Sequence, residues 1–153
     1  MIIIAHRGNI AGPNPARENH PDYITEAVER GYHVEVDVWY TKTGELFLGH
    51  DMPQYEVSPE FLTNDKFFCH AKNIDALNFL VKREINCFSH DKDPVVLTSQ
   101  GKLWMFPGTK PPADVSNAIF VMPEACSDDD KDWYVKGCYG VCTDFANKVW
   151  IGV

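Results

Sequence analysis

The sequence predicts an α/β protein built as a TIM-type (β/α)8 barrel in reduced form. About eight short apolar segments have strand character, and two amphipathic segments among them have helical spacing. Strands separated by helices are typical of parallel βαβ units. The chain has 153 residues, so eight units would have about 19 residues each, whereas barrels of this class usually take about 250 residues in all. Several helices must therefore be missing or shortened.

The first two elements lie near the amino terminus. Residues 2–5 are an unbroken apolar run, which is typical of a buried strand. Residues 22–31 predict a helix, because apolar residues recur there at helical spacing. Pro21 stands near the start of this segment and Gly31 marks its end, as expected for helix boundaries.

The next strand, residues 33–38, has Val34, Val36 and Val38 on one face. A second helix is predicted at 74–84, where apolar residues again share one side. The remaining strand candidates lie at 46–49, 67–71, 86–88, 103–106, 118–121 and 140–142, and a third helix candidate lies at 124–136.

Composition indicates a single globular domain over residues 1–153. The net charge is -8, and an acidic chain is poorly suited to nonspecific binding of nucleic acid or an anionic membrane. The longest fully apolar stretch, residues 1–5, is far shorter than the ~20 residues of a membrane span, and no signal peptide is expected. The five cysteines form no CxxC pair, so we expect reduced thiols and a cytoplasmic protein.

Two carboxylates stand out on the 33–38 strand. Glu35 and Asp37 are two residues apart and so point to the same face, opposite the three valines. A valine face packs against helices, which places the carboxylates inside or in a cleft. Such a pair shares a proton, pairs with a base or binds a divalent cation. A solvated face of an antiparallel strand is the alternative.

Histidines follow two other apolar segments. His6 and Arg7 come directly after residues 2–5, and His50 follows residues 46–49. Histidine exchanges protons near neutral pH, and the arginine fork matches a phosphate group. Two histidines can serve as general acid and general base, while a cation on the carboxylates neutralises phosphate oxygens. This combination points to cleavage of a phosphodiester.

At these residues the chain resembles the glycerophosphodiester phosphodiesterase family, within the phospholipase-C-like phosphodiesterases. The matching motifs are His6-Arg7, then Glu35-x-Asp37, then His50-Asp51, each at a predicted strand. Looser matches are Glu18-Asn19, Thr41-Lys42-Thr43-Gly44 and Thr143-Asp144. The resemblance is strong over residues 2–51 and fades afterwards. It implies a barrel with its site at the carboxyl ends of the strands, one divalent cation, and His6 and His50 as the catalytic pair.

The chain departs from the family pattern on the fourth strand. The family has Glu-x-Lys there, with a metal-binding glutamate and a phosphate-binding lysine, whereas this chain has His70-Ala71-Lys72. The resemblance thus implies Glu35, Asp37 and His70 as metal ligands, and Arg7 and Lys72 as substrate-binding residues. An imidazole suits Mn²⁺ or Zn²⁺ better than Mg²⁺ or Ca²⁺. The identity of the cation, whether Mg²⁺, Ca²⁺ or Mn²⁺, is left open.

The link between the second and third strands raises a conflict. Residues 41–44 look like a hairpin turn, and a parallel crossover normally needs a dozen or more residues. The resembled family has no regular helix in this link, and on that basis we expect a parallel pair. The small size also predicts an open pocket for the substrate alcohol, with Trp39, Tyr40, Trp104 and Phe106 as candidate lining residues.

Two functions from different classes follow. The first is a metal-dependent phosphodiesterase acting on a small glycerophosphodiester-like substrate. The second is a catalytically silent barrel that binds a phosphorylated ligand or a partner, suggested by His70 and by the short chain. A phosphodiesterase for nucleic acid is disfavoured by the acidic balance.

Overall fold

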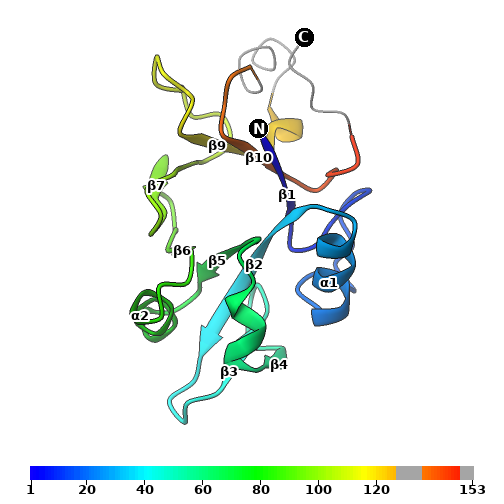
Figure 1. Ribbon diagram of the computed structural model, residues 1–153, viewed down its shortest axis with the longest axis vertical. Coiled ribbons are helices and arrows are strands. Elements are labelled where there is room, and N and C mark those ends of the chain that lie inside the picture. The colour runs from blue at the N-terminus through cyan, green and yellow to red at the C-terminus, as the bar shows by residue number, and fades with distance from the viewer. Residues whose placement is uncertain (127–135, 149–153) are drawn as a thin grey trace.

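The computed structural model describes residues 1–126 and 136–148, and these form one ten-stranded sheet with two α-helices on it (Figure 1). The helices are α1 (Pro21–Glu29) and α2 (Ile74–Lys82), and short 3-10 helices cover Pro59–Thr63 and Pro123–Ala125. The strands are β1 (Ile2–His6), β2 (His33–Tyr40), β3 (Leu46–Leu48), β4 (Tyr55–Val57), β5 (Phe67–Ala71), β6 (Cys87–Phe88), β7 (Val95–Leu97), β8 (Leu103–Met105), β9 (Ala118–Val121) and β10 (Gly140–Thr143). The helix candidate at 124–136 lies mostly outside the described residues.

Each α-helix begins at a side-chain cap. The His20 side chain accepts a hydrogen bond from the Asp22 amide at the start of α1, and Asn73 does the same for the Ala76 amide at the start of α2. Such caps satisfy amide groups that have no partner within the helix. No helix among residues 1–126 and 136–148 is long and apolar enough to cross a membrane.

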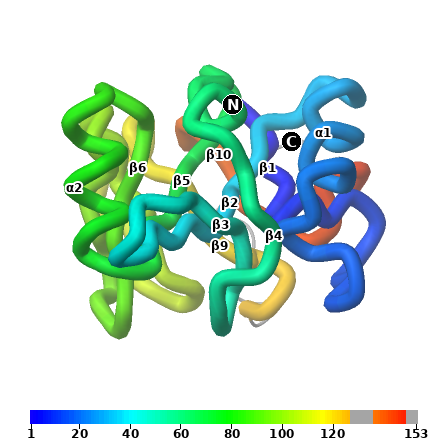
Figure 2. The backbone as a smooth tube through the Cα atoms, turned by 90° about the horizontal axis from the view of Figure 1, so that it is seen from below, coloured from blue at the N-terminus to red at the C-terminus, as the bar shows by residue number. Residues whose placement is uncertain are grey.

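The sheet is not a closed barrel, which corrects the (β/α)8 prediction. Seven strands pair in parallel in the order β6-β5-β2-β1-β10-β9-β8, while β3, β4 and β7 add antiparallel pairs. No backbone ladder joins β6 to β7 or β8 in the described part of the chain. The Phe88 and Trp104 rings, one from β6 and one from β8, stack there with centroids 4.3 Å apart. The sheet thus curves strongly but stays open (Figure 1). In the view of Figure 2, α1 and α2 lie at opposite sides of the molecule, with β1, β2 and β5 between them.

The chain is too short to place a crossover helix after each strand, and antiparallel hairpins replace some of them. The clearest is β2–β3, where Val38 pairs with Leu48 and the Thr41 amide donates to the Glu45 carbonyl. The expected parallel pairing of this strand is therefore wrong, and the local hairpin pattern was the better guide. The parallel neighbours of β2 are β1 and β5, and Asp37 of β2 pairs with His70 of β5.

The two faces of β2 divide as the sequence predicts. Val34, Val36 and Val38 are fully buried in the main apolar core, which also contains residues of α1 and α2. Burial of each valine contributes about 2 kcal/mol. Glu35 and Asp37 are also buried, with exposed fractions of 2% and 0%, but on the opposite, inner face. The solvated-strand alternative is thereby excluded for this pair.

Candidate metal centre

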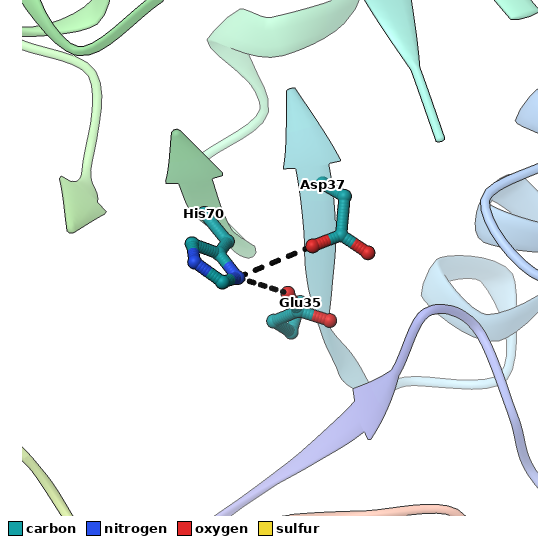
Figure 3. Close-up of side chains that lie close together, drawn as sticks. All are labelled: Glu35, Asp37 and His70. Carbon is teal, nitrogen blue, oxygen red and sulfur yellow. Dashed lines mark ion pairs between the residues drawn. The ribbon is translucent and has the colours of Figure 1, made fainter. Parts of the chain in front are cut away.

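Three potential metal ligands meet on neighbouring strands. Glu35 and Asp37 lie on the inner face of β2, and His70 lies beside them on β5. His70 Nδ1 is 3.2 Å from Asp37 Oδ1 and 3.6 Å from Glu35 Oε1 (Figure 3). One ligand atom from each residue falls within 4.8 Å of the other two. A cation of ordinary size fits a cluster of this spacing.

A backbone carbonyl on the side away from the carboxylates orients the His70 ring. Its Nε2 lies 3.2 Å from the carbonyl oxygen of His90, and a carbonyl only accepts hydrogen bonds, so Nε2 carries the proton. This arrangement leaves Nδ1 facing the two carboxylates. A backbone carbonyl that fixes the tautomer of a metal-binding histidine is a common feature of metal sites.

Of the three candidate ligands, Asp37 has the most polar contacts. The Asn19 amide donates to Oδ2 over 2.8 Å, and Asn19 Oδ1 accepts from the Asp37 amide over 3.0 Å. Arg7 Nε is 3.3 Å from Oδ2, and Lys72 Nζ is 3.8 Å from Oδ1. Oδ1 is buried, and its contacts with His70 and Lys72 are ion pairs without a hydrogen bond. A buried carboxylate oxygen in this situation fits a metal ligand.

The charges in this cluster shift two pKa values in opposite directions. Burial raises the pKa of Asp37, but the close contact with the charged His70 imidazole, together with Arg7, outweighs burial and lowers that pKa to about 2. Burial lowers the pKa of His70, but its contacts with Asp37 and Glu35 outweigh burial and raise it to about 9. In the metal-free protein a protonated imidazole thus supplies positive charge to the two carboxylates.

Metal affinity is therefore expected to depend on pH. A cation needs the Nδ1 lone pair of His70, so it must displace the proton, which is held with a pKa of about 9. We expect the apparent association constant for Mn²⁺ to rise about tenfold per pH unit between pH 6.5 and 8.5. Calorimetric titrations at several pH values, in buffers of different ionisation enthalpy, measure both this slope and the release of about one proton.

The control for this experiment is His70→Gln, which keeps a polar side chain but has no titrating nitrogen. It should bind Mn²⁺ more weakly and without the proton release seen for His70. An affinity of the unaltered protein that stays constant over this pH range contradicts His70 as a ligand.

His6 lies on the other side of Glu35, at the end of β1. Its Nδ1 is 2.7 Å from Asp144 Oδ1, and its Nε2 is 3.9 Å from Glu35 Oε2. Burial lowers the pKa of His6, but the hydrogen bond to Asp144 and the charge of Glu35 outweigh it and raise the pKa above its usual value. Asp144 is itself held by the Asn9 amide over 2.9 Å and donates its backbone N–H to Glu124. His6 is therefore oriented by a carboxylate, as the general base of many hydrolases is.

One cavity collects most of the predicted site residues. Its volume is about 400 Å³, and it is lined by His6, Arg7, Glu35, His50, His70 and Lys72. Asp37 does not line the cavity itself and is fully buried. His50 enters from the loop after β3 and is 43% exposed, with Nδ1 2.7 Å from the exposed carboxylate of Asp51. Every residue predicted as catalytic, phosphate-binding or metal-binding thus reaches this cavity or contacts a residue that does.

The aromatic prediction holds in part. Trp104 and Phe106 line the cavity together with Phe88, and Phe106 is 46% exposed. Tyr40 does not line it and instead stacks on Phe79 with ring centroids 5.0 Å apart. Trp39 is also absent from the lining and donates a hydrogen bond to Gly49.

The structure adds contributors that the sequence did not assign to the site. Asn9, Asn19 and Asp144 form hydrogen bonds to site residues, and the His90 carbonyl orients His70. Asn19 and Asp144 were visible only as looser family matches. Asn9 follows the His-Arg-Gly motif directly, and this position was the available signal.

The cavity therefore offers a cluster of cation ligands, two cationic side chains able to hold an anion, and two histidines able to transfer protons. Comparison of the chain with protein-family models and with curated proteins finds no match.

Proposed function

We propose that this protein is a metal-dependent phosphodiester hydrolase of the glycerophosphodiester phosphodiesterase kind, acting on a small substrate. The observation that carries the proposal is the meeting of His6, His50, Arg7 and Lys72 around the Glu35–Asp37–His70 cluster in one cavity. The motif resemblance over residues 2–51 supports the same chemistry.

The metal ligands proposed are Glu35, Asp37 and His70. When bound, a divalent cation supplies positive charge to the nonbridging phosphate oxygens. Two carboxylates and one imidazole form a donor set that favours Mn²⁺ or Zn²⁺ over Ca²⁺. We therefore expect these three side chains to determine which cation binds most tightly.

Arg7 and Lys72 hold the phosphate group. Arg7 lies between Glu18 and Asp37, with Nη1 3.2 Å from Glu18 Oε2 and Nε 3.3 Å from Asp37 Oδ2. These ion pairs fix the guanidinium plane while part of it still faces the cavity. A fixed planar donor binds phosphate oxygens without a large loss of side-chain entropy.

His6 and His50 transfer the protons. One takes a proton from the attacking hydroxyl or water, and the other gives a proton to the leaving alkoxide, so the two exchange states over one cycle. The resemblance implies that an adjacent substrate hydroxyl attacks phosphorus first and expels the alcohol. Water then opens the resulting cyclic phosphate to a monoester.

Turnover separates this proposal from the alternative of a catalytically silent binding protein. That alternative is suggested by His70, which stands where the resembled family has a glutamate. Purified protein is incubated with glycerophosphodiesters and Mn²⁺, Zn²⁺, Mg²⁺ or Ca²⁺, and the phosphomonoester product is measured. We expect hydrolysis, fastest with Mn²⁺ or Zn²⁺. Folded protein that binds a cation by calorimetry but releases no product with any of the four supports the silent protein instead.

A further inference from the structure

The inner face of β2 continues beyond the metal ligands to a third side chain, Trp39. Residues 35, 37 and 39 alternate onto the same face of the strand. The indole Nε1 of Trp39 donates a hydrogen bond to the carbonyl oxygen of Gly49 over 2.6 Å. Gly49 directly precedes His50, so this bond is made one residue before a proposed catalytic side chain.

The backbone N–H and the carbonyl of Gly49 both form hydrogen bonds to residues of β2. Its amide donates to the Asp37 carbonyl over 3.2 Å, while its own carbonyl accepts from Trp39. Its φ is 154°, and an added Cβ would lie 2.1 Å from the Met52 carbonyl oxygen, so only glycine fits this turn. The Gln54 amide closes the turn by donating to the Leu48 carbonyl over 3.0 Å.

The His50 side chain has a much weaker anchor of its own. Its hydrogen bond goes to Asp51, whose side chain is 87% exposed and belongs to the same turn. A contact within the turn cannot fix the turn relative to the sheet. The position of the imidazole in the cavity therefore depends on where the backbone is attached, and the side-chain part of that attachment is the indole of Trp39.

We propose that Trp39 is a positioning residue for His50, a role that rests on the proposed function for its catalytic consequence. The inner face of β2 then fixes two positions in the site, that of the cation and that of His50. Glu35 and Asp37 place the cation, and Trp39 places the proton-transferring histidine relative to it. A misplacement of about 1 Å in such a group costs on the order of 100-fold in rate.

The test uses Trp39→Phe, which keeps an aromatic ring but removes the donor. Two diesters are compared, one with an alkyl leaving group and one with p-nitrophenolate, which leaves without protonation. The losses of activity that His50→Ala shows on the two substrates serve as the reference pattern for a misplaced or missing His50 side chain. Trp39→Phe should reproduce that pattern with a loss of about tenfold on the more sensitive substrate, and should cause less than a twofold further loss in the His50→Ala background.

Two further readouts keep the inference independent of turnover. Mn²⁺ affinity by calorimetry should be unchanged in Trp39→Phe. The backbone amide order parameters of His50 and Asp51, measured by NMR, should fall from about 0.85 toward 0.6. Tyr40→Phe, a change to the next residue of β2, is the control and should alter neither readout.

The outcomes separate the inference from the proposed function. Absence of hydrolysis by the unaltered protein contradicts the proposed function, while a fall in the order parameters still supports Trp39 as the anchor. Unchanged order parameters in Trp39→Phe overturn the positioning role, whatever the activity. A pattern of losses over the two diesters that differs from the His50→Ala pattern, or full additivity with His50→Ala, also overturns it.

Discussion

Glu35→Gln should lower the affinity for Mn²⁺ by more than about 100-fold, since loss of an outer-shell partner alone costs 10–100-fold. The amide is nearly the same size as the carboxylate, so packing on the inner face of β2 is kept. What is lost is one negative charge, 3.6 Å from His70 Nδ1 and 3.9 Å from His6 Nε2. Calorimetric titration with Mn²⁺ measures the change.

Glu56→Gln is the matched control, because Glu56 lies exposed on β4, outside the cavity. It should leave the affinity within about twofold. Glu35→Gln should also unfold within a few degrees of the unaltered metal-free protein. If it binds Mn²⁺ as tightly as the unaltered protein, the carboxylate is not a ligand and the metal centre is wrong.

His6→Ala should lower the turnover of a phosphodiester by 10²–10⁴-fold, the usual contribution of a general acid or base. His6 is the proposed proton-transferring group that a buried carboxylate, Asp144, orients through a 2.7 Å hydrogen bond. The three proposed metal ligands stay in place and only a contact of Glu35 at 3.9 Å is lost, so Mn²⁺ affinity should fall by no more than about 100-fold, the upper end for an outer-shell partner. Steady-state kinetics with saturating Mn²⁺ measure the loss.

His33→Ala is the control for this substitution. His33 is the half-buried first residue of β2, and it does not line the cavity. It should keep full turnover. Far-UV circular dichroism checks that both variants are folded. Turnover by folded His6→Ala within about threefold of the unaltered protein contradicts a catalytic role for His6.

The strands could be predicted largely because they are apolar runs with local boundaries. Predicted strands at 2–5, 33–38, 67–71 and 118–121 fall within a residue or two of β1, β2, β5 and β9. The strands β4 and β7 were missed, although β3, β6 and β8 are just as short, because neither contains a buried residue: Glu56 of β4 is exposed, and so are Val95 and Leu97 of β7. A short exposed strand leaves no periodic signal.

Strand pairing was predicted less well, because it depends on residues far apart in the chain. Whether β6 meets β8 is decided by the whole curvature of the sheet, and the (β/α)8 prediction failed there. At β3 the local turn 41–44 indicated the correct antiparallel pair, and the family resemblance led away from it. A short connection constrains topology more strongly than likeness to a larger fold.

The site divides in the same way. The alternation of Glu35 and Asp37 with three valines predicted from local geometry that the two carboxylates share one face of β2, and it left open whether that face is buried or solvated; the structure shows both carboxylates buried. The partners of those residues were harder to foresee. Asp144 is 138 residues from His6 in the chain, and Asn19 is 18 residues from Asp37. Only the folded sheet brings them together.

Anomalous diffraction from crystals grown with Mn²⁺ tests the metal centre most directly. The expected result is one strong peak about 2.0–2.3 Å from carboxylate oxygens of Glu35 and Asp37 and from His70 Nδ1. Phosphate added to such crystals should then lie between this peak and the side chains of Arg7 and Lys72. A Mn²⁺ peak elsewhere, with His70 still paired to Asp37, would contradict the account.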